Sequence, residues 1–228
     1  MQTIPIYNSK FCILIPTINR ADLLKEALFV YTYCFPNTYI YVLDNGNQHI
    51  EDFDNSKIFI LKENQLGVAE SWNHLIAFND IFDYMLILND DICLHTTEQA
   101  IYDIIDKDDK NTFYVCEPKN NWSAFLLSQS VYSKVGLFDE NFERCYYEDN
   151  DYHYRIKLNN VNFKHEPRLN PTTYRNSQTI AKDPHLNNST NNRQYYINKW
   201  GGEPNYETFT KPFNLANLIY NNKNNKNE

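Results

Sequence analysis

The sequence predicts a single-domain α/β fold with a mostly parallel central sheet flanked by helices. Short apolar segments alternate with amphipathic helical segments from Phe11 to Leu88, which is the pattern of consecutive βαβ units. These apolar segments are hydrophobic on both faces, as strands covered by helices on both sides are. A chain of 228 residues, 42% of them hydrophobic, is long enough for one large domain with a substantial core.

The expected elements follow from hydrophobic spacing along the chain. Strands are expected at Phe11–Ile15, Tyr39–Leu43, Lys57–Leu61, Tyr84–Leu88, Thr112–Val115 and Ser123–Leu127. Helices are expected at Ala21–Tyr33, Val68–Asn79, Thr96–Ile105, Gln129–Val135, Glu148–Asn159 and Asn192–Lys199. The stretch between Val161 and the last helix is rich in proline and polar residues, so it is expected to be loop.

Composition and the chain ends restrict the possible partners and compartment. The net charge of −8 counts against binding to duplex nucleic acid, because phosphate recognition needs clustered Lys and Arg. There is no run of about 18 apolar residues and no apolar segment near Met1, so neither a membrane span nor a signal peptide is expected. The five cysteines are scattered, odd in number and without a CxxC pair, which indicates free thiols. A cytoplasmic protein is therefore expected.

Three polar clusters directly follow predicted strands. They are Pro16–Arg20, Asp44–Asn47 and Asn89–Asp91. Ligands of open α/β sheets bind outside the carboxyl ends of the strands, where these clusters would lie. Each cluster alone is more typical of an ordinary turn, because Asp, Asn and Gly are turn residues.

Two acidic groups have the chemistry of a catalytic or metal site. Adjacent carboxylates at Asp90 and Asp91 repel each other unless a cation neutralises them, and oxygen ligands suit Mg²⁺ or Mn²⁺. The alternative is a helix N-cap supplied by Asp91 or Thr96. The second group, Glu148–Asp151, begins a predicted helix beside aromatic residues. It can supply a general base, although acidic residues also favour a first helical turn through the helix dipole.

Six motifs occur in an order and spacing that resemble the family 2 glycosyltransferases of the GT-A fold. The residues are FCILIPTINR (11–20), VLDNG (42–46), ENQLGVAESWN (63–73), LILNDDI (86–92), GLFDENF (136–142) and YEDNDYHYR (147–155). Each motif is weak alone, and the resemblance runs from about residue 11 to about residue 201. It implies a Rossmann-like GT-A fold and transfer of a sugar from a nucleoside-diphosphate sugar.

The resemblance implies a role for specific residues of the donor site. Its donor-binding residues would be Pro16, Thr17, Arg20, Asp44, Asn64, Gly67, Asn73, Asp90 and Arg175. Asp44 would accept a hydrogen bond from uracil N3–H, and Asp91 would ligate Mn²⁺ or Mg²⁺. Many relatives carry a histidine as a further metal ligand in the region where this chain has Arg175. Either Arg175 would contact the diphosphate directly, or the metal would be held by Asp91, phosphate and water.

The same resemblance implies the acceptor side and the chemistry. Trp122 and Ser123 would line the acceptor site, although core packing explains Trp122 equally well. Asp149 would be the base of an inverting reaction, with Glu148 beside it. Residues of about 10–95 would form the nucleotide-sugar half, about 96–205 the acceptor half, and Asn221–Glu228 a disordered tail.

Other functions remain open on the sequence alone. A nucleotidyltransferase or a Rossmann dehydrogenase would carry a glycine-rich loop after the first strand, where this chain has Pro16–Arg20. A non-catalytic nucleotide-sugar-binding module would not need Asp149. Glycosylation of a modified DNA base is disfavoured by the negative charge. The sequence does not identify the donor sugar, the oligomeric state, or whether the acceptor is a glycan, a lipid-linked sugar or a protein.

Overall fold

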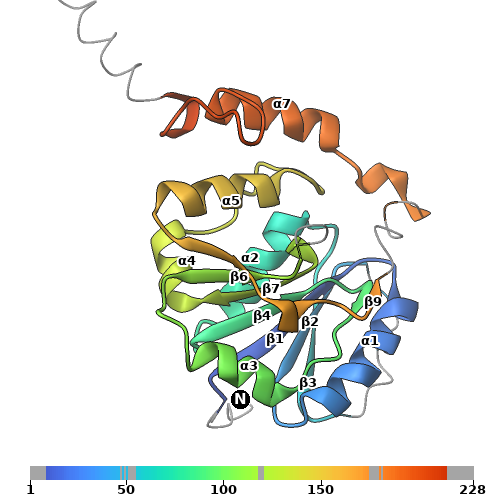
Figure 1. Cartoon of the computed structure of the whole chain (residues 1–228). Helices are drawn as coiled ribbons and strands as arrows, with labels where there is room; N and C mark the ends of the chain where they lie inside the picture. The colour runs from blue at the N-terminus through green and yellow to red at the C-terminus, as the bar shows by residue number, and fades with distance from the viewer. Residues whose placement is uncertain are drawn as a thin grey trace, which may run out of the picture.

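The computed structural model describes residues 9–46, 48, 50, 55–117, 121–174, 180 and 182–214. Its central sheet has helices on both faces, and a further helix, α7, lies beyond α5 (Figure 1). The strands of this sheet are β1 Phe11–Thr17, β2 Ile40–Asp44, β3 Ile58–Lys62, β4 Tyr84–Leu88, β6 Thr112–Val115, β7 Ala124–Ser128 and β8 Asn162–His165. The helices are α1 Ala21–Cys34, α2 Val68–Phe78, α3 Glu98–Ile105, α4 Gln129–Val135, α5 Glu148–Leu158 and α7 Ser189–Trp200.

The strand order of the seven-stranded sheet is β3-β2-β1-β4-β7-β6-β8. Strands β3, β2, β1 and β4 pair in parallel, and β6 pairs with β8 in parallel. Only β7 is reversed, being antiparallel to both β4 and β6. The predicted α/β fold with a mostly parallel sheet is therefore confirmed.

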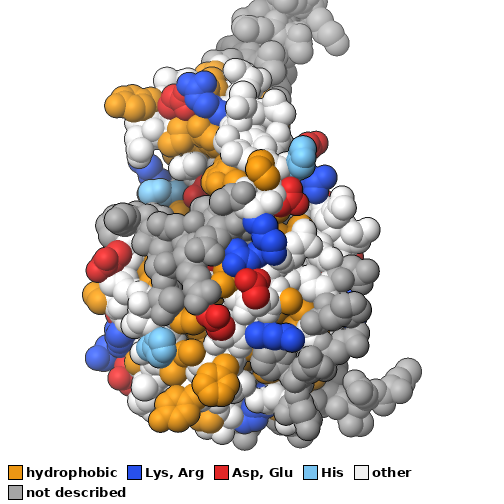
Figure 2. All heavy atoms as spheres, turned by 90° about the vertical axis from the view of Figure 1, so that its right-hand side faces the viewer, with side chains coloured by type: hydrophobic (Ala, Val, Ile, Leu, Met, Phe, Trp, Pro, Cys, Tyr) orange, Lys and Arg blue, Asp and Glu red, His pale blue; other side chains and the backbone are white. Residues whose placement is uncertain are grey.

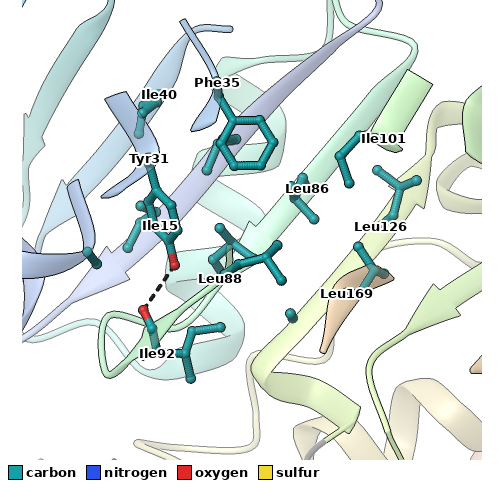
Figure 3. Packing of buried hydrophobic residues seen from close by; sticks show 14 of the residues in the cluster. Ile15, Tyr31, Phe35, Ile40, Leu86, Leu88, Ile92, Ile101, Leu126 and Leu169 are labelled. Atoms are coloured by element: carbon teal, nitrogen blue, oxygen red, sulfur yellow. Dashed lines mark hydrogen bonds between the residues drawn. The ribbon is translucent and has the colours of Figure 1, made fainter. Parts of the chain in front are cut away.

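The sheet buries a hydrophobic layer on each face. Along β1, Phe11, Ile13 and Ile15 belong to the layer under α1 and α3, whereas Cys12 and Leu14 belong to the layer under α2, α4 and α5. This alternation follows from the two-residue period of a strand, and it explains why β1 is apolar at every position from Phe11 to Ile15. In the first layer, the hydroxyl of Tyr31 donates a hydrogen bond to the carbonyl of Ile92 at 3.0 Å (Figure 3).

The stretch after Val161, which was predicted to be loop-rich, contains a strand that the sequence did not predict. Strand β8 forms there, and Phe163 pairs in register with Phe113 of β6. Their rings stack with centroids 5.9 Å apart, which anchors a strand whose other side chains are mostly polar. A small second sheet pairs β5, Ile92–Cys93, with β9, Thr173–Tyr174. Short 3-10 helices also occur, at Asn121–Ser123, Pro167–Leu169, Pro184–Leu186 and Pro212–Asn214.

Two further features concern the cysteines and the helices. All five cysteines are free thiols, and only Cys34 is not buried. In the described part of the chain, no helix is both long and apolar enough to cross a bilayer. The tail predicted at Asn221–Glu228 lies outside the described residues.

Candidate functional site

The site is built where the strand order of the sheet reverses. From β1 the chain adds β2 and β3 on one side and β4 on the other, so a crevice is expected between the carboxyl ends of β1 and β4. The two ends are joined by a hydrogen bond of 2.6 Å from the Thr17 hydroxyl to the Asp90 carboxylate. Thr17 is also in register with Asp44 of β2. Sequence clusters 27 to 73 residues apart thus meet at one edge of the sheet.

Asp90 is a buried carboxyl group. Burial and, to a smaller extent, the nearby charge of Asp91 raise its pKa to about 7, against the opposing effects of Thr17 and Arg20. Arg20 is itself buried and pairs with Asp22 through Nε at 3.1 Å and Nη2 at 3.2 Å. The charges of Asp90 and Asp91 contribute to the raised pKa of Arg20, so its guanidinium lies near both.

The acidic pair suits a divalent cation that is only partly held by protein. Among the described residues, no group of three or more His, Cys, Asp or Glu side chains is placed to hold a metal ion. Asp90 and the half-buried Asp91 nevertheless supply hard oxygen atoms, and burial disfavours the charge of Asp90. A cation at Asp91 would therefore need further oxygen ligands from a bound phosphate or from water.

Asp44 is positioned at the end of β2 but is already engaged with the protein. It is fully buried and accepts hydrogen bonds from the backbone N–H of Gly46 at 3.2 Å and of Gln48 at 3.0 Å. The Gln48 side chain donates another to Asp44 at 3.3 Å. The carboxylate therefore stabilises the turn after β2.

A cavity of about 180 Å³ opens beside this edge of the sheet. Its walls come from the segments after β1, β2 and β3, from the loop before α5 and from the segment preceding α7. The lining residues are Ile18, Asn19, Asn45, Gly46, Asn64, Gln65, Arg144, Asp183, His185 and Leu186. A Cβ atom on Gly46 would lie 2.6 Å from Asn19 Oδ1, so only glycine allows these two walls to approach.

Two of the predicted donor residues, Asn64 and Gly67, shape this cavity. Asn64 lines it and forms an isolated β-bridge with Gly46. Gly67 begins α2, and its N–H donates to Glu70 Oε2 at 2.7 Å. The next N–H, of Val68, donates to the carbonyl of Arg144 at 2.7 Å. A Cβ on Gly67 would lie 3.1 Å from the Arg144 nitrogen, so Gly67 permits close packing of the loop that carries Arg144.

Asn73 and Trp122 both contribute to packing around the site. Asn73 is buried, donates to the carbonyl of Phe138 at 2.9 Å and accepts from the N–H of Phe138 at 2.9 Å. It therefore anchors the loop after α4 and does not line the cavity. The Trp122 ring packs against Phe113 and Phe125, with distances between ring centroids of 5.1 Å and 5.3 Å. This agrees with the core-packing alternative.

Ser123 links this aromatic cluster to the acidic pair. Its carbonyl accepts a hydrogen bond of 2.9 Å from the backbone N–H of Asn89, the residue before Asp90. Both Trp122 and Ser123 are only half-buried. They therefore flank the Asn89–Asp91 turn on the side of β7, away from β1.

The pair Glu148–Asp149 begins α5 after a strained loop. Tyr146 and Tyr147 have φ values of 81° and 75°, a left-handed conformation that is costly for residues other than glycine. Glu148 is buried, and its Oε2 has no hydrogen-bond partner. Burial raises the pKa of Glu148 well above its usual range, and Asp149 adds to the effect. Asp149 is half-buried, and burial raises its pKa as well.

Sequence reasoning missed several residues of the cavity. Asn45, Gln65, Arg144 and His185 line it, whereas the predicted Arg175 lies outside the described residues. Asn45 directly follows Asp44, and its amide holds Leu66 through two hydrogen bonds of 2.7 Å, so its place in the strand-end cluster was the available signal. Nothing in the local sequence marks Arg144 or His185, because both reach the cavity only through the packing of distant loops.

The charge on the adjoining face is mixed. Figure 2 shows the face that includes α1, with basic and acidic side chains lying next to one another over its described part. Exposed aromatic side chains on this helix include Phe29 and Tyr33, at 78% and 87% of their full exposure.

Comparisons with known proteins give no sequence relative but clear structural ones. No family model and no curated protein sequence matches the chain. The mannosyltransferase PcManGT from Pyrobaculum calidifontis, in complex with GDP-Man and Mn²⁺, matches with a TM-score of 0.57 at 13% identity, over 73% of this chain and 57% of that one. GalNAc-T7 with UDP, GalNAc and Mn²⁺ matches with a TM-score of 0.65 at 11% identity, over 83% of this chain and 48% of that one.

A third match is the catalytic domain of Drosophila beta1,4-galactosyltransferase 7 in complex with xylobiose. Its TM-score is 0.53 at 13% identity, and the alignment covers 74% of this chain and 72% of that one. The chain spans about half of the length of the first two proteins, 57% and 48%. At such low identity the likeness concerns the fold alone. The chain has the α/β fold of the GT-A glycosyltransferases.

Proposed function

We propose that this chain is a metal-dependent, inverting glycosyltransferase that uses a UDP-linked sugar as donor and a glycan, lipid-linked or protein hydroxyl as acceptor. The observation that carries the proposal is the cavity at the carboxyl ends of β1, β2 and β3, bordered by the loop that leads into Glu148–Asp149. The matched mannosyltransferase and GalNAc-T7 were crystallised with GDP-Man or UDP and with Mn²⁺, and both have this fold.

The polar walls of the cavity fit a nucleoside diphosphate. The amide group of Asn64 can hydrogen-bond a base or ribose, and Arg144 can pair with phosphate oxygens. Arg20 adds a second guanidinium near the Asp90–Asp91 turn. Trp122 and Ser123, on the β7 side of that turn, are the proposed start of the acceptor side.

In the proposed reaction Asp149 acts as the base. Its carboxylate accepts the proton of an acceptor hydroxyl, and the hydroxyl oxygen bonds to the anomeric carbon of the donor. The bond from that carbon to the diphosphate oxygen breaks, and the nucleoside diphosphate leaves with the electron pair. A single displacement inverts the anomeric configuration. Burial raises the pKa of Asp149, and a raised pKa makes its carboxylate a stronger base.

A divalent cation bound by Asp91 and the diphosphate would neutralise the negative charge that the leaving group gains. Asp90 would keep the Thr17 hydroxyl in place, since their hydrogen bond is 2.6 Å long. We predict that Asp91 and Asp149 lie on opposite sides of the bound diphosphate sugar.

The test separates the base from donor binding. Asp149→Asn should reduce sugar transfer and UDP-glucose hydrolysis by at least about 10³-fold, within the range that general bases contribute, while the Kd for UDP measured by calorimetry stays unchanged. Asp106→Asn is the matched control, because Asp106 is an exposed carboxylate at the end of α3. Transfer by Asp149→Asn at a near wild-type rate would refute the base assignment.

The metal assignment needs a separate experiment. Asp91→Ala should weaken UDP binding in the presence of Mn²⁺ and leave the weaker metal-free binding unchanged. A thermal-shift screen over nucleotide sugars identifies the donor, because a bound ligand raises the melting temperature. Wild-type protein that binds a nucleotide sugar but neither transfers nor hydrolyses it would indicate a binding module and refute the enzymatic proposal.

A further inference from the structure

Helix α7 packs against the loop that leads into the acidic pair of α5. A small hydrophobic cluster joins them, with Phe142 before the loop, Tyr154 on α5, and Tyr196 and Trp200 on α7. Tyr147, the residue directly before Glu148, packs on Tyr196 with ring centroids 5.7 Å apart. Residues of α7 therefore pack in one cluster with residues more than 40 positions earlier in the chain, next to the loop that leads to the proposed base.

One polar side chain on this helix holds the loop backbone. Asn192 is 2% exposed, and its amide nitrogen lies 2.8 Å from the carbonyl oxygen of Glu143, 3.1 Å from that of Cys145 and 2.9 Å from that of Tyr146. The Asn192 oxygen accepts a hydrogen bond of 3.1 Å from the amide of Asn188. The three carbonyls fix the amide orientation, because only the nitrogen side can donate.

Three residues of the segment held by Asn192 have backbone conformations that are unfavourable for residues other than glycine. Arg144, Tyr146 and Tyr147 have φ values of 63°, 81° and 75°. Non-glycine residues keep such angles only where surrounding contacts impose them. The segment ends at Glu148, so the direction in which α5 begins depends on these contacts.

We propose that Asn192 is a positioning residue, which holds the strained loop 143–147 so that the acidic pair at the start of α5 faces the donor. This inference rests on the proposed function. The cavity wall is held separately, because the carbonyl of Arg144 is bonded to Val68 N at 2.7 Å and not to Asn192. Loss of the Asn192 amide should therefore disturb the base more than the donor pocket.

The kinetic test uses Asn192→Ala and Asn192→Asp. Aspartate keeps the size of the side chain but replaces the donor with an acceptor that repels the three carbonyls. Both variants should lower kcat for donor turnover at least tenfold and change the donor KM by less than threefold. Tyr196→Phe is the matched stability control. It lies one turn further along the same buried face of α7 and loses its hydrogen bond to Glu207.

The outcomes distinguish positioning from stability. Tyr196→Phe should keep kcat within twofold even where its melting temperature falls as far as that of Asn192→Ala. Equal losses of kcat in the two variants, or an unchanged kcat in both Asn192 variants, would overturn the proposal.

Hydrogen exchange gives a readout that does not need activity. The amides of residues 146–150 should exchange at least tenfold faster in Asn192→Ala than in wild type or Tyr196→Phe. Unchanged exchange would refute the anchoring even if the protein proves inactive. A wild-type protein without transfer or hydrolysis, but with faster exchange in Asn192→Ala, would instead refute the proposed function alone.

Discussion

Replacing Lys199 with methionine tests how α7 is held against the rest of the domain. The Lys199 ammonium lies 2.6 Å from Asp139 Oδ2 and 2.6 Å from Asp151 Oδ1. Lys199 is 5% exposed and Asp151 is fully buried. Methionine keeps most of the side-chain volume, so the change removes the charge while leaving the packing nearly intact.

The size of the stability loss depends on the hydrogen bonds that Asp139 and Asp151 retain without Lys199. Removing one partner of a buried ion pair costs about 3–5 kcal/mol, because the remaining charge is left uncompensated. Asp151 still accepts from Arg155 Nε at 2.8 Å and from Trp200 Nε1 at 2.8 Å, and Asp139 still accepts from the Tyr195 hydroxyl at 3.0 Å. We therefore expect the lower end, about 3 kcal/mol. For a domain of this size that is about 6–12 °C in Tm.

The assay is reversible thermal unfolding followed by circular dichroism. Lys10→Met is the matched control, because Lys10 pairs with Asp106 at 2.8 Å but the two side chains are 54% and 56% exposed. It should leave the Tm nearly unchanged, since exposed pairs contribute little. Adding Asp139→Asn to Lys199→Met should recover part of the loss by removing an unpaired charge. A Tm for Lys199→Met equal to that of Lys10→Met would refute the reasoning.

The pH dependence checks the same network. Burial raises the pKa of Asp139, but the hydrogen bond and charge of Lys199 outweigh it and hold the pKa below its usual range. A lowered folded-state pKa means that Asp139 contributes stability above the usual Asp range and loses it as pH falls through the lower value. Without Lys199 the folded-state pKa of Asp139 should rise, so this loss of stability on acidification should become smaller, and an unchanged profile would contradict the assignment.

Three further substitutions test the site. Glu148→Gln should make the Tm less dependent on pH above the usual range of Glu pKa values. Burial raises the pKa of Glu148, so the wild-type protein should lose stability as the pH rises toward that pKa. A wild-type Tm that does not fall in this pH range would contradict the reasoning. Gly67→Ala should weaken UDP binding severalfold in calorimetry, because its Cβ would lie 3.1 Å from the Arg144 nitrogen and push that loop away; an unchanged Kd would show that the loop yields. Asn73→Ala should cost about 2–3 kcal/mol in urea unfolding, since it leaves both backbone groups of Phe138 unpaired, whereas a loss below 1 kcal/mol would mean that they find other partners.

The sheet could be predicted because its central strands contain continuous runs of hydrophobic residues. Strand β4, Tyr84–Leu88, was predicted with its observed bounds, since all five of its residues are buried. Strand β8 was missed because three of its four residues are polar and it lies at the edge of the sheet. Only its Phe163 packs inward, and one apolar residue gives no periodicity to detect.

The positions of the strand-end clusters could be predicted, but the hydrogen-bond partners of their side chains could not. Three polar clusters after apolar strands indicate one site, because the ends of parallel strands share an edge. Which atoms remain available depends on turns that are set by the whole fold. Asp44 was predicted to bind a nucleobase, yet the turn at Gly46 and Gln48 uses its carboxylate. Whether the predicted donor and acceptor residues bind substrate stays a prediction.

The role of α7 lay beyond sequence reasoning for a physical reason. The helix carries Asn192 and Lys199, and polar residues in an asparagine-rich stretch are typical of a solvated surface. Both are buried here, because each finds several partners on a loop or helix more than 40 residues earlier. Removing either partner leaves a buried polar group unsatisfied, so the energy of each contact depends on both of its partners. The hydrogen bonds of Asn192, the ion pairs of Lys199 and the aromatic cluster fix α7 to both the loop 143–147 and α5. A displacement of α7 would therefore have to move the start of α5 as well.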